Sequence, residues 1–192
     1  MQLPSLFVSH GSPMMALEPS AARDYLSSLG GTLPRPKAIL VASAHHDANW
    51  TGGRATVTSA ALPETVHDFG GFPQALFDMR YPAQGDPDLA ARVVNILSQH
   101  GVDVQADNQR GLDHGAWVPL SLAYPDADIP VVQVSIYSNA SPAWHYALGA
   151  ALAPLRDEGV LIIGSGSITH NLRAVFGGGR ENLSPIDPSV TD

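Results

Sequence analysis

Histidines follow the ends of three apolar runs in this chain of 192 residues. His10 follows SLFVS, His45 and His46 follow AILVASA, and His170 follows VLIIGSG after a short turn. In open α/β sheets ligands bind at the carboxyl ends of the strands, so we expect these imidazoles to converge on one edge of a sheet. Clustered neutral imidazoles favour metal binding first and acid–base catalysis second.

Each of these histidines also has a structural interpretation. A single histidine at a strand end is more often a hydrogen-bonded structural residue, but the joint placement of His10, His45 and His170 favours ligands. Neighbours in an extended backbone point to opposite sides, so only one of His45 and His46 is expected to be a direct ligand. His114 lies in GLDHGAW, a turn-rich segment before an apolar helix. His67, in VHDFGGFP, either lines a pocket or bonds the backbone of a turn.

The elements that position these side chains are read from the apolar pattern. Four runs rich in Val, Ile or Leu predict buried strands, namely SLFVS, AILVASA, VVQVSI and VLIIGSG. A fifth run, ATVTSA, predicts a strand more weakly. Two helices are predicted between them, over residues 87–100 and 142–158, each with an Asp or Ser cap, Pro at the first position and Gly after the end. We therefore expect one α/β domain, with a central, largely parallel or mixed sheet flanked by helices. This domain is predicted to cover residues 1–176, and residues 177–192 form a polar, Gly/Pro-rich tail.

Composition excludes several classes of protein. The net charge is −8 with only ten Lys and Arg, which argues against nucleic acid or an anionic membrane as a partner. The chain has no cysteine, so any metal is held by imidazole and oxygen ligands. No run approaches the length of a membrane span, and the N-terminus lacks the features of a signal peptide, so we expect a cytoplasmic protein. GSGSITH has neither the P-loop lysine nor the GxGxxG spacing, which disfavours nucleotide binding.

Six segments together resemble one known family over most of the chain, from Leu6 to about Arg173. They are FVSHGSPMMALE, LPRPKAILVASAHH, TVHDFGGFPQALFDMRYPAQGDP, LDHGAWVPL, YPDADIPVVQVSI and AWHYALGAALAPLRDEGVLIIGSGSITHNLR. In this order they are similar to the DODA-type extradiol aromatic ring-opening dioxygenases, which belong to the class III, LigB-like superfamily.

The resemblance implies an enzyme that inserts both atoms of O₂ into an L-DOPA-like catechol and releases a muconic semialdehyde-type product. Iron(II) is the implied catalytic metal, and zinc can occupy related sites. His10 and His45 match the metal-binding histidines. His170 matches a third active-site histidine, either a ligand or the acid–base residue. His114 matches a histidine near the substrate, while His67 and Phe69 belong to the loop beside the pocket.

The resemblance also shows one departure. Members of the family continue beyond the end of this chain, and their C-terminal segment carries a further metal-site histidine in a PEH-like motif, which this sequence lacks. An alternative is therefore an inactive remnant or a non-catalytic metal-binding protein. A third possibility is a zinc hydrolase, although no HExxH motif is present.

Overall fold

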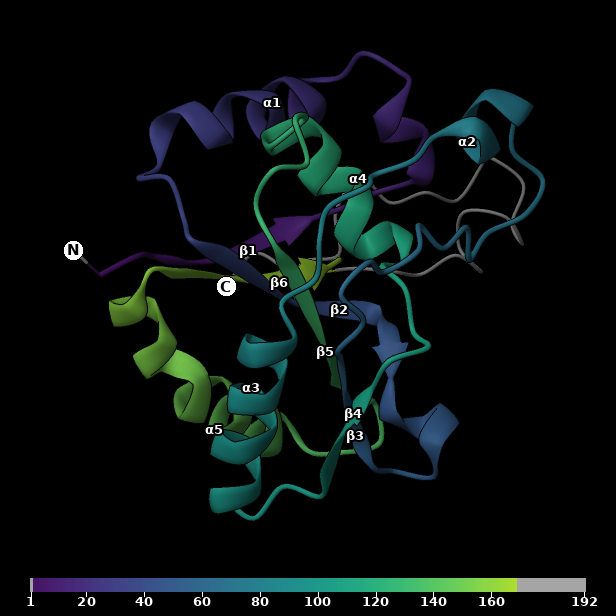
Figure 1. Ribbon diagram of the computed structural model, residues 1–192. Coiled ribbons are helices and arrows are strands. Elements are labelled where there is room, and N and C mark those ends of the chain that lie inside the picture. Colours follow the sequence, from purple (N-terminus) through teal and green to yellow (C-terminus); the bar gives the residue numbers. More distant parts are fainter. Residues whose placement is uncertain (1, 169–192) are drawn as a thin grey trace, which may run out of the picture.

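The computed structural model describes residues 2–168, in which a mixed sheet carries helices on both faces (Figure 1). Within this part of the chain the sheet has six strands in the order β1-β6-β2-β5-β3-β4. The strands are β1 (Ser5–Ser9), β2 (Ala38–Asp47), β3 (Ala55–Thr58), β4 (Val104–Asp107), β5 (Val131–Ile136) and β6 (Val160–Gly166). The predicted fold class is confirmed.

Parallel pairing brings the carboxyl ends of the central strands to one edge of the sheet. β6 lies between β1 and β2, and β2 also pairs with β5, all in parallel. β3 pairs in parallel with β4 but antiparallel with β5, which makes the sheet mixed. β1, β2 and β6 therefore end side by side, and two of the candidate histidines lie at the ends of β1 and β2.

The described helices form two layers. They are α1 (Ala21–Thr32), α2 (Gln74–Asp78), α3 (Pro87–Gln99), α4 (His114–Ala123) and α5 (Pro142–Leu152), with short 3-10 turns η1 (Pro13–Ala16), η2 (Ala48–Thr51) and η3 (Ala153–Glu158). Figure 1 shows α1 and α4 on one face of the sheet and α3 and α5 on the other. None of them has the length and apolar character that a membrane crossing requires.

Each layer encloses its own apolar core. Successive side chains of a strand point to opposite faces. In β2, Ile39 and Val41 therefore pack towards α1 and α4, while Leu40 packs towards α3 and α5. In β6, Leu161 and Ile163 belong to the first core, and Val160 to the second. This two-sided burial explains why these strands are continuous apolar runs in the sequence.

The predicted helix starts are confirmed, but one helix ends early. Asp86 caps α3 by accepting a hydrogen bond from Leu89 N, and Ser141 caps α5 in the same way. The α-helical geometry of α5 ends at Leu152 and continues as the 3-10 turn η3, whereas the sequence predicted one helix to residue 158. Pro154 explains the change, because proline has no N–H for the helical ladder. α1, α2 and β4 were not predicted.

Candidate active site

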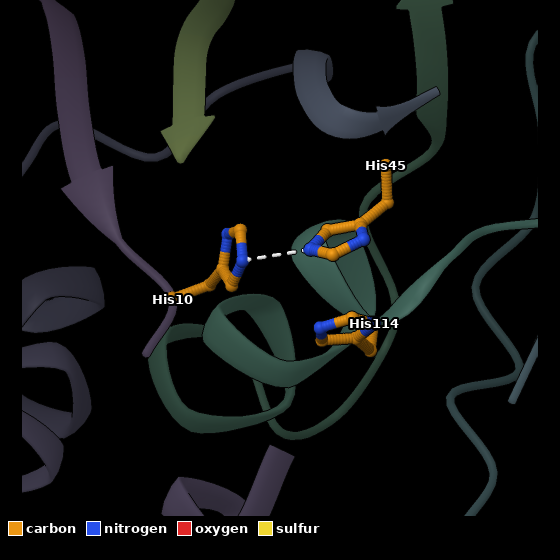
Figure 2. Close-up of side chains that lie close together, drawn as sticks. All are labelled: His10, His45 and His114. Carbon is orange, nitrogen blue, oxygen red and sulfur yellow. Dashed lines mark hydrogen bonds between the residues drawn. The ribbon is translucent and has the colours of Figure 1, made fainter. Parts of the chain in front are cut away.

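Three histidines from distant parts of the sequence meet at the edge of the sheet (Figure 2). His10 follows β1, His45 lies near the end of β2, and His114 is the first residue of α4. One ring nitrogen of each lies within 4.8 Å of the others, and Nε2 of His10 is 3.0 Å from Nε2 of His45. His10 and His114 are buried and His45 is half-buried. The expected convergence is thus observed for His10 and His45, His114 joins them from α4, and His170 lies outside the described residues.

The backbone at His45 is held by side chains instead of by the sheet. The pairing of β2 with β5 is irregular between Ser43 and Asp47, so the strand leaves its ladder here. Ser43 Oγ accepts a hydrogen bond from His45 N, and Arg110 donates from Nη2 to His45 O at 2.8 Å. Both groups also contact the fully buried carboxylate of Asp113. One polar network, made of Ser43, Arg110 and Asp113, therefore holds the backbone of His45 in place.

The orientation of His10 follows from its hydrogen bonds. Ser165 Oγ donates to Gly115 O, so its only proton is already used. Nδ1 of His10 lies 2.9 Å from Ser165 Oγ, so Nδ1 must carry the proton and donate it to that hydroxyl oxygen. In this tautomer Nε2 carries the lone pair, and Nε2 is the atom that faces His45.

A carboxylate that the sequence did not single out joins the other two histidines. Asp68 Oδ1 accepts from Nδ1 of His114 at 2.8 Å and from His114 N at 3.0 Å. Oδ2 of the same group lies 3.5 Å from Nδ1 of His45. Burial raises the pKa of the Asp68 carboxyl, but the hydrogen bonds and charge of His114 outweigh this, and the pKa lies below its ordinary value. Asp68 therefore remains a carboxylate at neutral pH.

These residues fit a divalent metal ion. Two imidazole nitrogens bound to one cation at about 2.1 Å, at about a right angle, lie about 3 Å apart. This matches the 3.0 Å between His10 and His45. A set of imidazoles with a carboxylate next to two of them is a donor set that suits iron and zinc.

A cavity of about 520 Å³ opens beside the histidines. Its lining includes all three imidazoles together with the rings of Phe69 and Phe72, which lie edge to face at 5.4 Å. The ring of Phe69 also stands edge-on to His114, with centroids 5.6 Å apart. The cavity thus combines an aromatic wall with clustered imidazoles, and its volume is in the range of small-molecule sites.

His67 lies behind this wall and is not among the described residues that line the cavity. Its Nε2 is 3.1 Å from Met79 O, and its ring contacts Phe69 and Trp117 edge-on. The backbone-bonding role that the sequence left open is therefore observed for His67. Any effect on a ligand would pass through Phe69.

His46 points away from the site, as the alternation along the strand predicts. It is buried, with Nε2 2.7 Å from Thr56 Oγ1, and its Nδ1 has no hydrogen-bond partner among the described residues. Burial and, secondarily, the charge of Arg110 lower the pKa of His46 to about 4.

We expect His46 to make stability pH-dependent. Its pKa is depressed in the folded state, so the unfolded chain binds more protons between pH 6.5 and pH 4. The stabilisation is complete above pH 6.5 and falls by about 3 kcal/mol as the pH is lowered through this window. Urea unfolding of the wild type and of His46→Gln between pH 4 and pH 6.5 measures this change in the free energy of unfolding. A constant difference between the two free energies of unfolding would contradict the expectation.

Gly115, next to His114, leaves no room for a side chain. A Cβ at this position would overlap Ser43 Oγ and approach His45 Cδ2 to 3.2 Å. Since Ser43 is held by Asp113, we expect Gly115→Ala to lower the free energy of unfolding by about 1–3 kcal/mol and to weaken metal binding. Gly149→Ala in α5 is the matched control, because its Cβ meets nothing within 4 Å. Denaturant unfolding and metal titration of both variants test this, and equal behaviour would disprove it.

Comparison with known proteins assigns the chain to a class. Residues 4–182 match the family described as the catalytic LigB subunit of aromatic ring-opening dioxygenase, and the chain belongs to this family. The predicted resemblance is thereby confirmed.

Two curated relatives and one solved structure are similar to this chain. It is 50% identical over 175 residues to the 4,5-DOPA dioxygenase extradiol of Escherichia coli (strain K12), covering 91% of this chain and 62% of that protein. It is 49% identical over 170 residues to the protein of the same name from Beta vulgaris, covering 86% and 62%. A crystal structure of an uncharacterized Escherichia coli K12 protein matches with a TM-score of 0.72 at 42% identity, covering 90% and 63%. The chain thus spans less than two thirds of the length of these relatives.

Proposed function

We propose that this protein is a non-haem, metal-dependent extradiol dioxygenase that cleaves the ring of an L-DOPA-like catechol with O₂. One observation carries the proposal: imidazoles from residues 10, 45 and 114 converge beside an aromatic-walled cavity. Membership of the ring-opening dioxygenase family and the names of the relatives support the reaction and the substrate class.

The proposal assigns each described residue a task. His10 and His45 hold Fe(II), and Zn(II) is the other metal that this donor set would accept. When bound, the metal ion lowers the pKa of the catechol hydroxyls and provides a path for electrons from the ring to O₂. His114 orients the substrate and takes the hydroxyl proton. For His170, which lies outside the described residues, we propose a role as the third metal ligand or as the acid–base group.

The aromatic wall suits a flat substrate. Phe69 and Phe72 both line the cavity and meet at nearly a right angle, 82° between ring planes. Edge-to-face and offset contacts of this kind stabilise aromatic pairs beyond the area that they bury. The ring of a catechol would contact these side chains while its two oxygens face the histidines. His67 would support this wall from behind, through its contact with Phe69.

The decisive experiment is oxygen uptake by the purified chain after anaerobic loading with Fe(II). L-DOPA and unsubstituted catechol serve as alternative substrates, with iron content measured in parallel. We expect O₂ consumption with one equivalent taken up per ring cleaved, and a yellow product that absorbs in the visible. Bound iron without uptake from any catechol would reject the dioxygenase proposal. Hydrolysis of an ester by the zinc-loaded chain would favour the zinc hydrolase, and a metal-loaded chain inert in both assays the non-catalytic alternative.

A further inference from the structure

We propose that Asp68 is a positioning residue that holds His114 with its proton on Nδ1, so that Nε2 is the basic atom presented to the substrate. The inference deepens the proposed function and rests on it for its use in catalysis. It is carried by two hydrogen bonds from one residue to one carboxylate oxygen: Asp68 Oδ1 accepts from Nδ1 and from the backbone N of His114.

The chemistry of the acceptor fixes the tautomer. A carboxylate has no proton to donate, so the 2.8 Å contact requires His114 to donate from Nδ1. Neutral histidine in water prefers the opposite tautomer, with the proton on Nε2. The contact therefore selects the less common form, and only this form can accept a proton at Nε2.

The setting of this pair makes the contact strong and rigid. The side chain of His114 is 6% exposed and that of Asp68 is 21% exposed, so little water competes for the bond. The second bond, to His114 N, fixes the backbone from which the ring projects. An imidazole that gains a proton at Nε2 would also be stabilised by the adjacent negative charge.

The same segment connects this carboxylate to the aromatic wall. Asp68 is followed directly by Phe69, whose ring lines the cavity and stands edge-on to His114. A substrate ring that packs on Phe69 would therefore bear on the residue next to Asp68. Substrate binding and the orientation of the base would in this way depend on one short segment.

A purely structural role is the alternative, because Asp68 also serves as a cap for α4. Asp113, at the N-cap position of that helix, makes no side-chain cap bond, and Asp68 accepts the N–H of the first helical residue instead. Loss of Asp68 would thus lower stability under either interpretation. The test needs a measurement that helix capping alone would not change.

Nitrogen-15 NMR of the histidine side chains in the metal-free, full chain is that measurement. At a pH where His114 is neutral, we expect its Nδ1 to be protonated and its Nε2 not, with the signals assigned through His114→Gln. In Asp68→Ala the tautomer should revert to protonated Nε2. Asp68→Asn keeps an acceptor oxygen and should retain the wild-type tautomer in large part. Asp86→Ala, which removes a carboxylate cap from α3, should leave the His114 signals unchanged.

Kinetics per bound iron then connects the tautomer to turnover. We expect Asp68→Ala to lower kcat by about 10–100-fold with a smaller change in KM, and Asp68→Asn to recover part of the loss. Asp86→Ala should keep the wild-type kcat and KM.

Protonated Nε2 on His114 in the wild type would overturn the inference, even if Asp68→Ala failed to fold. An unchanged tautomer and kcat in a folded Asp68→Ala would do the same. Failure of the proposed function is distinguishable: a chain that consumes no O₂ but carries protonated Nδ1 on His114, lost in Asp68→Ala, keeps the positioning role. Ring cleavage by a chain whose His114 is protonated on Nε2 would reject the positioning role alone.

Discussion

Replacing His45 by alanine is expected to remove O₂ uptake and to weaken binding of Fe(II) or Zn(II) by more than about 100-fold. The reason is geometric, because His45 supplies the nitrogen that lies 3.0 Å from Nε2 of His10, and no other described imidazole comes from β2 into the site. Loss of a residue that merely supports a ligand costs about 10–100-fold in affinity, so loss of a ligand should cost more. Competition with a chelator of known affinity measures the change.

His100→Ala is the matched control for this prediction. His100 is exposed at the C-terminal end of α3, where Nδ1 is 2.9 Å from Ile96 O, and it is not one of the three histidines that meet at the site. We expect its removal to leave metal affinity and uptake at the wild-type level. Metal binding in His45→Ala equal to that in His100→Ala would remove His45 from the metal site.

Replacing Asp113 by alanine is expected to lower the free energy of unfolding by about 3–5 kcal/mol. Its carboxylate is fully buried and accepts from Ser43 Oγ and Gln133 Nε2, each at 2.6 Å, and from Arg110 Nη2 at 3.1 Å. Removal would leave the donors of the buried side chains Ser43 and Gln133 without this acceptor. Because Ser43 and Arg110 also hold the backbone of His45, metal affinity should fall together with stability.

Two comparisons make the Asp113 prediction specific. Asp128→Ala breaks an ion pair with Arg35 in which the side chains are 62% and 50% exposed, and it should leave the unfolding midpoint unchanged. Asp113→Asn keeps one acceptor oxygen and should be milder than alanine. Urea unfolding of the three variants provides the ranking. Asp113→Ala as stable as Asp128→Ala would show that the buried network contributes nothing.

Periodicity and strand ends were enough to predict the fold class and part of the site. The apolar runs before His10 and His45 are strands, and the parallel pairing through β6 brings their ends together. The alternation of side chains along β2 also predicted that only one of His45 and His46 faces the site, since adjacent side chains of a strand point to opposite sides. These features depend on local sequence, which is why they can be read from it.

The residues that orient the histidines could not be predicted in the same way. Asp68 lies 46 positions from His114, and Ser165 lies 155 positions from His10, so neither contact has a local signature. A carboxylate in a glycine-rich loop has the same local pattern whether it faces water or an imidazole. α1 was missed because its apolar stripe is weak, with only Leu26 and Leu29 buried, and β4 because it is a four-residue edge strand.

The position of β6 between β1 and β2 has a consequence for how the site is made during synthesis. Chains leave the ribosome N-terminus first, and β1 has its only described sheet partner in β6, which begins at Val160. His10 is translated before His45 and His114, yet β6, which pairs with β1 and carries its partner Ser165, emerges about 155 residues later. A nascent chain paused before β6 would hold His45 and His114 without a place for His10. The metal site that we propose for His10 and His45 would therefore form only after nearly all of the described chain has been translated.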